Sequence, residues 1–326
     1  MSKHSKQLIM LACLIIFGLC IYFSVFFGHT ILNLTDLINY ISGKSTDNTF
    51  ILEYLRLPRC FNAIVAGSCL ALAGLFMQTT TKNPLAEPYI TGVSSGAGLA
   101  LIMVILYDIS PAYYPLASFM GAMLSSLIVL GFAGLNKFSM VKLILTGLSI
   151  NIFTSSLISL LMLTNVDKTH SMMMILAGNL TNKLNIFKPL LIMFGICLIL
   201  CIYIIPKLNF LRLDNNMVSA LSQNTNKYNI FIVVLSSILA SVSVCAAGIL
   251  GFIGIIVPHI SRLLFGFDFR WLFFANILIG SSLILFSDYL ARTITYPMEL
   301  PLGLILSIIG APIFVMCIIV RGKQLV

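Results

Sequence analysis

Four ionisable side chains lie within or beside long apolar stretches of this chain and are its best candidates for chemistry. Asp288 and Arg292 are four residues apart, the spacing at which two side chains meet on one face of an α-helix. His259 follows Pro258, and Glu299 lies a short way beyond Arg292. A proton-coupled transporter would use such buried groups as relays. Alternatively, Asp288 and Arg292 form an ion pair that makes a helix end tolerable in a membrane, and His259 has a capping or structural role.

Three other patterns could suggest catalysis or ligand binding, and each has a simpler explanation. The glycine-rich stretch from Gly92 to Gly98 lacks the Lys followed by Ser or Thr that a phosphate loop needs, so close helix packing is favoured. Met172, Met173 and Met174 could contact a soft metal or a haem, but adaptable packing in an external loop is the more common use of methionine. Neither a His-Glu-x-x-His pair nor an order of residues typical of a serine hydrolase is present. We therefore predict no catalytic site and no metal site, and expect any nucleotide to be bound by another chain.

The composition indicates which elements must position these groups. Apolar residues make up 59% of the 326 positions and charged residues 9%, whereas a soluble domain has roughly 25% charged residues. This composition is that of a polytopic membrane protein. Stretches of about 20 apolar residues, the length that spans a bilayer, cover residues 7–27, 60–77, 89–107, 112–134, 141–163, 187–205, 229–247, 271–291 and 302–320. A tenth, short helix is expected at about 258–267, because Gly248, Gly251, Gly254 and Pro258 interrupt the apolar run there.

The distribution of positive charges predicts the orientation. With ten spans and the N-terminus inside, twelve of the 19 Lys and Arg residues fall in cytoplasmic segments: Lys3, Lys6, Lys82, Lys137, Lys142, Lys207, Arg212, Lys227, Arg262, Arg270, Arg321 and Lys323. The positive-inside rule therefore favours cytoplasmic N- and C-termini. The net charge of +9 is explained by this orientation and by contact with anionic lipid, so no nucleic-acid partner is expected. The N-terminal apolar stretch lacks a cleavage site and is interpreted as a retained helix. The eight cysteines lie in or beside apolar stretches and are expected to be buried, unreactive thiols.

Seven short motifs rich in glycine, proline and charged residues follow one another along the chain. They are Leu-Arg-Leu-Pro-Arg at 55–59, Asn-Pro-Leu-Ala-Glu-Pro at 83–88, Gly-Val-Ser-Ser-Gly-Ala at 92–97, Gly-Phe-Ile-Gly at 251–254, Val-Pro-His at 257–259, Glu-Leu-Pro-Leu-Gly at 299–303 and Ile-Gly-Ala-Pro-Ile-Phe at 309–314. In these motifs the chain resembles, from about residue 50 to 320, the permease subunits of the type II ABC importers for iron siderophores, haem and cobalamin. The resemblance implies an all-α fold of about ten transmembrane helices, forming one domain over residues 1–326 in the bacterial cytoplasmic (inner) membrane.

The resemblance also implies partners and a division of labour among them. A second permease, identical or paralogous, would pair with this chain, two cytoplasmic ATPase subunits would bind ATP and Mg, and an extracytoplasmic binding protein would deliver the ligand. No cofactor is expected in this chain itself. A ferric siderophore is favoured on family breadth, haem comes second and cobalamin third. A secondary transporter driven by an ion gradient remains the alternative.

Three arginines match family residues on the outer side. Arg56, Arg59 and Arg292 correspond to the arginines that face acidic groups of the binding protein, where charge pairing guides docking and register. Because Arg56 and Arg59 lie at the outer end of a span, we expect only a docking partner to use them. The alternative is that all three side chains snorkel to the membrane interface.

Two groups of residues match the family on the cytoplasmic side. The segment at about 206–228 should receive the ATPase, although Ser222 stands where the family usually has Gly and Ser219 where a basic residue is common. Its contact residues would be Asp214, Val218, Ser219, Leu221 and Ser222. Asn83 and Leu85 match the loop that narrows the pathway, together with Met140 and Val141, whose apolar side chains would resist water leakage. A solvated loop and ordinary helix-end packing are the respective alternatives.

Overall fold

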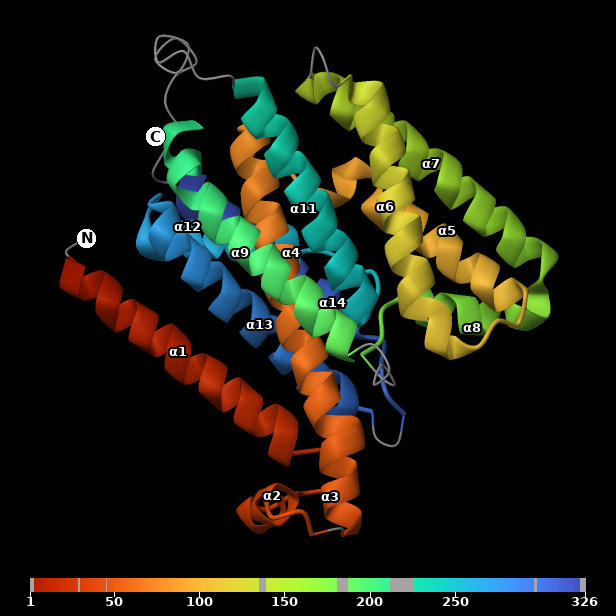
Figure 1. Cartoon of the computed structure of the whole chain (residues 1–326), viewed down its shortest axis with the longest axis vertical. Helices are drawn as coiled ribbons and strands as arrows, with labels where there is room; N and C mark the ends of the chain where they lie inside the picture. The colour runs from red at the N-terminus through yellow and green to blue at the C-terminus, as the bar shows by residue number, and fades with distance from the viewer. Residues whose placement is uncertain are drawn as a thin grey trace.

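The structure is a computed structural model that describes residues 3–28, 30–44, 46–134, 139–180, 187–211, 225–295 and 298–322, and every regular element in these ranges is a helix (Figure 1). The first half contains α1 (Lys3–Phe26), α2 (Leu34–Ile41), α3 (Asp47–Ile51), η1 (Leu52–Arg56), α4 (Leu57–Thr81), η2 (Pro88–Thr91), α5 (Val93–Leu106), η3 (Pro111–Tyr113) and α6 (Tyr114–Ala133). The second half contains α7 (Met140–Thr164), α8 (Val166–Leu176), α9 (Phe187–Leu211), α11 (Thr225–Ala247), α12 (Ile253–Phe265), α13 (Phe269–Thr293) and α14 (Leu302–Gly322).

The predicted all-α fold of about ten membrane helices is confirmed. Among the described residues, seven helical stretches are long and apolar enough to cross a membrane, and α5, α12 and α14 add shorter apolar helices. Several predicted boundaries differ from the observed ones by four residues or more. The span expected over 89–107 begins as a helix only at Val93, after the short η2, and the helix expected at 258–267 begins at Ile253.

Helix α12 starts before Pro258 because a residue of the adjacent α4 compensates for the proline. Pro258 has no N–H to donate, so the carbonyl of Gly254 would be left without its usual helical partner. The side-chain amide of Gln78, on α4, donates to that carbonyl at 3.0 Å. An adjacent helix thus satisfies the freed backbone group, as membrane helices that contain proline require.

The methionines that the sequence suggested for an external loop lie in a helix instead. Met172, Met173 and Met174 belong to α8, so the loop assignment was wrong. Met172 is fully buried and packs with Ile102 and Ile105 of α5, whereas Met173 and Met174 are exposed. The apolar packing predicted as their more common use is therefore the observed role of Met172.

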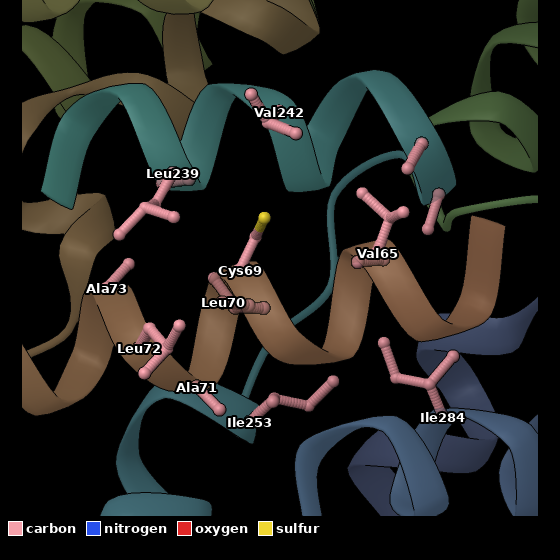
Figure 2. Packing of buried hydrophobic residues seen from close by; sticks show 14 of the residues in the cluster. Val65, Cys69, Leu70, Ala71, Leu72, Ala73, Leu239, Val242, Ile253 and Ile284 are labelled. Atoms are coloured by element: carbon pink, nitrogen blue, oxygen red, sulfur yellow. The ribbon is translucent and has the colours of Figure 1, made fainter. Parts of the chain in front are cut away.

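The core of the bundle surrounds α4, which is almost entirely buried and mixes small side chains with large ones such as Phe76 and Met77. Figure 2 shows Cys69 and Val65 of α4 facing Leu239 and Val242 of α11, while the other side of α4 faces Ile253 and Ile284. Small side chains such as alanine and glycine let the helix backbones approach closely, which is the usual way that membrane helices pack. The most closely packed helix is therefore also the one that carries Arg59 at its first turn.

The helices at the periphery expose apolar side chains. Figure 1 places α1 and α7 at opposite edges of the bundle, with α4 between them. Leu8 of α1 and Leu163 of α7 are 68% and 77% exposed, as suits helices that face lipid or another subunit. In the same view α2 and α3 lie at one end of the bundle, called here the α3 end, and the last turn of α9 and the first turn of α11 lie at the opposite end.

Candidate functional site

A cluster of charged side chains joins α4, α13 and the segment before α14 at the α3 end. Arg59 donates from Nε to Oδ1 of Asp288 at 2.8 Å and from Nη1 to both carboxylate oxygens of Glu299 at 3.0 and 3.1 Å. Arg292 donates from Nε to Oδ2 of the same Asp288 at 3.0 Å and from Nη2 to the carbonyl of Ser24 at 3.2 Å. Asp288 thus bridges two guanidinium groups, and we call the set of Arg59, Asp288, Arg292 and Glu299 the outer ionic cluster.

The members of this cluster differ in their access to solvent. The side chains of Asp288 and Arg292 are 1% and 4% exposed, that of Arg59 is 13% exposed, and that of Glu299 is 36% exposed. The predicted meeting of Asp288 and Arg292 on one helix face is confirmed. The pair between Arg59 and Glu299 spans 240 residues of sequence, and no local pattern indicates it.

Arg56 lies beside the outer ionic cluster but bonds to the backbone. It donates from Nη1 to the carbonyl of Phe27 at 3.0 Å and from Nη2 to that of Thr30 at 3.3 Å, which ties η1 to the end of α1. It is buried, as is Arg292. The expectation that only a docking partner could use Arg56 and Arg59 was therefore wrong, because both have partners within the chain. Their role in docking stays a prediction, and Arg59 offers the more accessible edge.

Two of the motifs meet in a second site, which is partly buried. The carboxylate of Glu87 accepts from the backbone N–H of Phe252 at 3.3 Å, and burial raises the pKa of Glu87. The hydroxyl of Tyr89 donates to the carbonyl of Leu250 at 2.8 Å and accepts from the N–H of the same residue at 3.1 Å. Phe252 has a φ of +69°, a conformation that costs roughly 1–3 kcal/mol in a non-glycine residue. These contacts hold the non-helical backbone between α11 and α12, and the sequence analysis did not assign Glu87 or Tyr89 any role.

The predicted gate residues lie near one another at the opposite end of the bundle. The side chain of Asn83 accepts from the N–H of Leu85 at 2.9 Å, and Leu85 is 54% exposed. Ala86 and Met140 pack in one hydrophobic cluster, whereas Val141 is exposed. The loop and the start of α7 therefore meet, and the gating role stays a prediction. The predicted ATPase contacts lie outside the described residues: Asp214, Val218, Ser219, Leu221 and Ser222.

An open groove runs along α7 and is lined in part by hydroxyl groups. Its volume is about 620 Å³, and its lining residues are Asn151, Ile152, Ser155, Ser156, Ser159, Leu160 and Leu163. Ser156 and Ser159 donate to the carbonyls of Ile152 and Ser155, each at 2.9 Å, and stay exposed. Each hydroxyl oxygen can still accept a hydrogen bond. The groove thus mixes four polar residues with three apolar ones on a largely apolar helix, and the sequence analysis missed it.

Metal-ligating side chains do not gather in the part of the chain that the structure describes. No group of three or more His, Cys, Asp or Glu residues there could hold a metal ion. The cysteines in these ranges are thiols rather than disulfides, and six of the eight are buried. The outer ionic cluster contains two arginines, whose guanidinium groups have no lone pair to offer a metal ion.

Comparisons with known proteins agree over nearly the whole length of the chain. The model of the FecCD transport family matches residues 14–321. The probable heme-iron transport system permease protein IsdF of Staphylococcus aureus (strain MSSA476) is 33% identical over 317 residues, which cover 97% of this chain and 96% of that protein. The probable siderophore transport system permease protein YfiZ of Bacillus subtilis (strain 168) is also 33% identical, over 331 residues and 99% of each protein.

Solved structures give the same fold. A metal-chelate type ABC transporter in an inward-facing conformation superimposes with a TM-score of 0.82 and 26% identity, covering 96% of this chain and 99% of the other. PsaBC from Streptococcus pneumoniae, solved in complex with Fab, gives a TM-score of 0.58 with 17% identity over 86% of this chain and 95% of the other. The second similarity supports the fold alone.

Proposed function

The chain belongs to the FecCD transport family, and we propose that it is the permease subunit of an ATP-driven importer for iron held in an organic ligand, either a siderophore or haem. The observation that carries this proposal is the end-to-end similarity to both a haem-iron and a siderophore permease at 33% identity. Equal similarity to the two relatives leaves the ligand open between these classes. The multi-pass helical bundle is consistent with a role in translocation across a membrane.

In the proposed complex, this chain guides the ligand while its partners bind it and supply energy. Two ATPase subunits would bind ATP and Mg on the cytoplasmic side. Both termini of this chain would lie on that same side. An external binding protein would deliver the ligand at the α3 end. A second permease, identical or paralogous, would complete the pathway. The permease itself catalyses no reaction in this scheme, and it should hold the ligand weakly, because tight binding would trap it in the pathway.

The groove on α7 supports a pathway at the interface with the second permease. Hydroxyl and amide groups are poorly solvated by lipid chains, so the exposed serines in this groove are best explained by contact with water or with another protein chain. The hydrophobic side chains Ile152, Leu160 and Leu163 alternate with these polar groups in the lining. Such a mixed surface offers weak, replaceable contacts to a bulky chelate.

We expect Ser159→Phe to lower transport by roughly tenfold or more, because passage depends on the width and lining of the pathway. Ser149→Phe is a matched control, since Ser149 is exposed on the same helix, donates to the carbonyl four residues earlier at 2.9 Å and lies outside the groove. Uptake of an iron-55 chelate into proteoliposomes measures the effect, with thermal stability recorded for both variants. Equal transport by both variants would contradict the assignment of the groove to the pathway.

The outer ionic cluster supports docking of an acidic partner at the α3 end. With Arg56 included, the outer ionic cluster carries three positive and two negative side chains, and Arg59 is partly accessible. Charge complementarity of this kind raises the association rate and fixes the register of docking. A proton relay is disfavoured because Asp288, its best candidate, is buried and both of its carboxylate oxygens already accept from guanidinium groups.

The composition of the native complex tests the proposed function. The chain would be tagged, purified in a mild detergent from cells that produce its whole transport system, and analysed by mass spectrometry and visible absorbance. We expect an ATP-binding chain and a binding protein to co-purify, and the binding protein to carry a haem or a ferric chelate. Active transport by the chain purified without any ATP-binding partner would overturn the proposal in favour of a secondary transporter.

A further inference from the structure

The two carboxylates on Arg59 are not equivalent. Asp288 is buried and shared with Arg292, so its pair with Arg59 is part of the packed interior. Glu299 is 36% exposed and bonds to Arg59 through the outer nitrogen Nη1. Removing one partner of a buried ion pair is costly, whereas an exposed pair contributes little. Of the two carboxylates, Glu299 is therefore the one that another acidic group could replace.

The backbone around Glu299 is anchored on both sides, so exchange requires only a rotation of its side chain. On the N-terminal side, the N–H of Met298 donates to the carbonyl of Thr295 at 2.9 Å. On the C-terminal side, the N–H of Leu300 donates to the carbonyl of Ala291 on α13 at 3.0 Å, and the N–H of Gly303 donates to the carbonyl of Ala177 at 2.9 Å. A Cβ atom on Gly303 would lie 2.5 Å from that carbonyl oxygen, so the close approach requires glycine. Anchoring keeps the Glu299 carboxylate at a high effective concentration beside Arg59.

We propose that Glu299 is an internal competitor that occupies the accessible edge of Arg59 and is displaced by an acidic group of the external binding protein. The proposal rests on the proposed function, in which that protein docks on the outer ionic cluster. In the free permease Glu299 neutralises and covers Arg59. In the docked state a carboxylate of the partner takes its place on Nη1, and Glu299 turns to solvent. The competitor weakens docking, which allows the binding protein to leave after it has delivered its ligand.

Two measurements on the permease–ATPase complex in lipid nanodiscs test this proposal. The first is the rate at which phenylglyoxal modifies Arg59, read by mass spectrometry of the peptide that contains it. The second is the dissociation constant of the binding protein that co-purifies with the wild-type complex. We expect Glu299→Gln to accelerate modification of Arg59 several-fold and to lower the dissociation constant about threefold to tenfold. The reason is that the partner's carboxylate then no longer competes with Glu299 for Arg59.

Control variants separate competition from general electrostatics and from structural damage. Glu53→Gln removes the same charge from an exposed residue of η1 that makes no ion pair within the described residues, and it should change neither measurement. Combining Glu299→Gln with Arg59→Gln should abolish the gain in affinity. If Glu299 has a structural role instead, Glu299→Gln should raise the dissociation constant and make the complex less stable.

The outcomes for the competitor and for docking itself are distinguishable. If Arg59→Gln weakens docking but Glu299→Gln does not tighten it, or if phenylglyoxal reactivity is unchanged in Glu299→Gln, the competitor role is overturned while docking stands. If Arg59→Gln leaves the dissociation constant unchanged, the docking role of Arg59 is overturned, and the competitor role with it.

Discussion

Asp288→Asn should destabilise the permease strongly while leaving the pH dependence of the remaining transport unchanged. The carboxylate is 1% exposed and accepts from both Arg59 and Arg292, so its removal leaves two guanidinium groups with one exposed acid between them. Breaking a buried pair from one side costs about 3–5 kcal/mol. The apparent melting temperature of the complex, measured by size-exclusion chromatography after heating, should therefore fall clearly.

Two further variants sharpen this expectation. Asp108→Asn is the matched control, because Asp108 pairs with Lys168 at 2.6 Å but is 81% exposed, and such surface pairs contribute about 0–1 kcal/mol. Adding Arg292→Met to Asp288→Asn removes one of the unpaired charges and should restore part of the stability. A stable Asp288→Asn complex whose uptake profile is shifted in pH would refute the structural role and revive proton coupling.

Gly74→Ala should prevent the bundle from assembling, even though alanine is the better helix former. A Cβ atom on Gly74 would clash with the carbonyl oxygen of Gly254, so α4 and the start of α12 would have to separate. Backbone cannot yield as a flexible side chain does, and overpacking a core costs about 1–3 kcal/mol or more. Separation would also break the hydrogen bond from Gln78 to Gly254. The yield of monodisperse complex after extraction is the measurement.

The control variant for this prediction should leave the yield of complex unchanged or raise it. Gly195 lies inside α9, and among the described residues a Cβ atom added to it would meet no neighbouring side chain or helix within 4 Å. Gly195→Ala should leave the yield unchanged or raise it, since alanine favours a helix over glycine by roughly 1 kcal/mol. Loss of the complex in both variants would mean that glycine is required for reasons other than the contact between α4 and α12.

The fold was largely predictable because hydropathy and helix periodicity are local signals. The apolar stretches indicated the number of membrane helices, and the spacing of Asp288 and Arg292 correctly predicted one ion pair. The start of α12 was not predictable, because it depends on Gln78, 176 residues earlier, satisfying a carbonyl freed by Pro258. Helix α8 was missed because it is short and mixes polar with apolar residues.

The sequence identified residues of the candidate site but not the contacts between them. The motifs singled out Arg59 and Glu299, yet nothing local indicates that side chains 240 residues apart share a hydrogen bond. Likewise, the motifs that contain Glu87 and Phe252 were both recognised, but their contact arises from tertiary packing. A carboxylate placed between alanine and proline in a chain with 9% charged residues was the one available signal for Glu87.

The most direct test of the central claim is the energy source for uptake. The complex would be reconstituted with its ATPase subunits and binding protein in proteoliposomes that carry an imposed proton gradient. Entry of an iron-55 chelate would be followed with and without ATP-Mg, each in the absence and in the presence of a protonophore. A permease of an ATP-driven importer should show uptake that requires ATP-Mg and persists when the proton gradient is collapsed. Uptake that proceeds without ATP and stops on addition of the protonophore would contradict the claim.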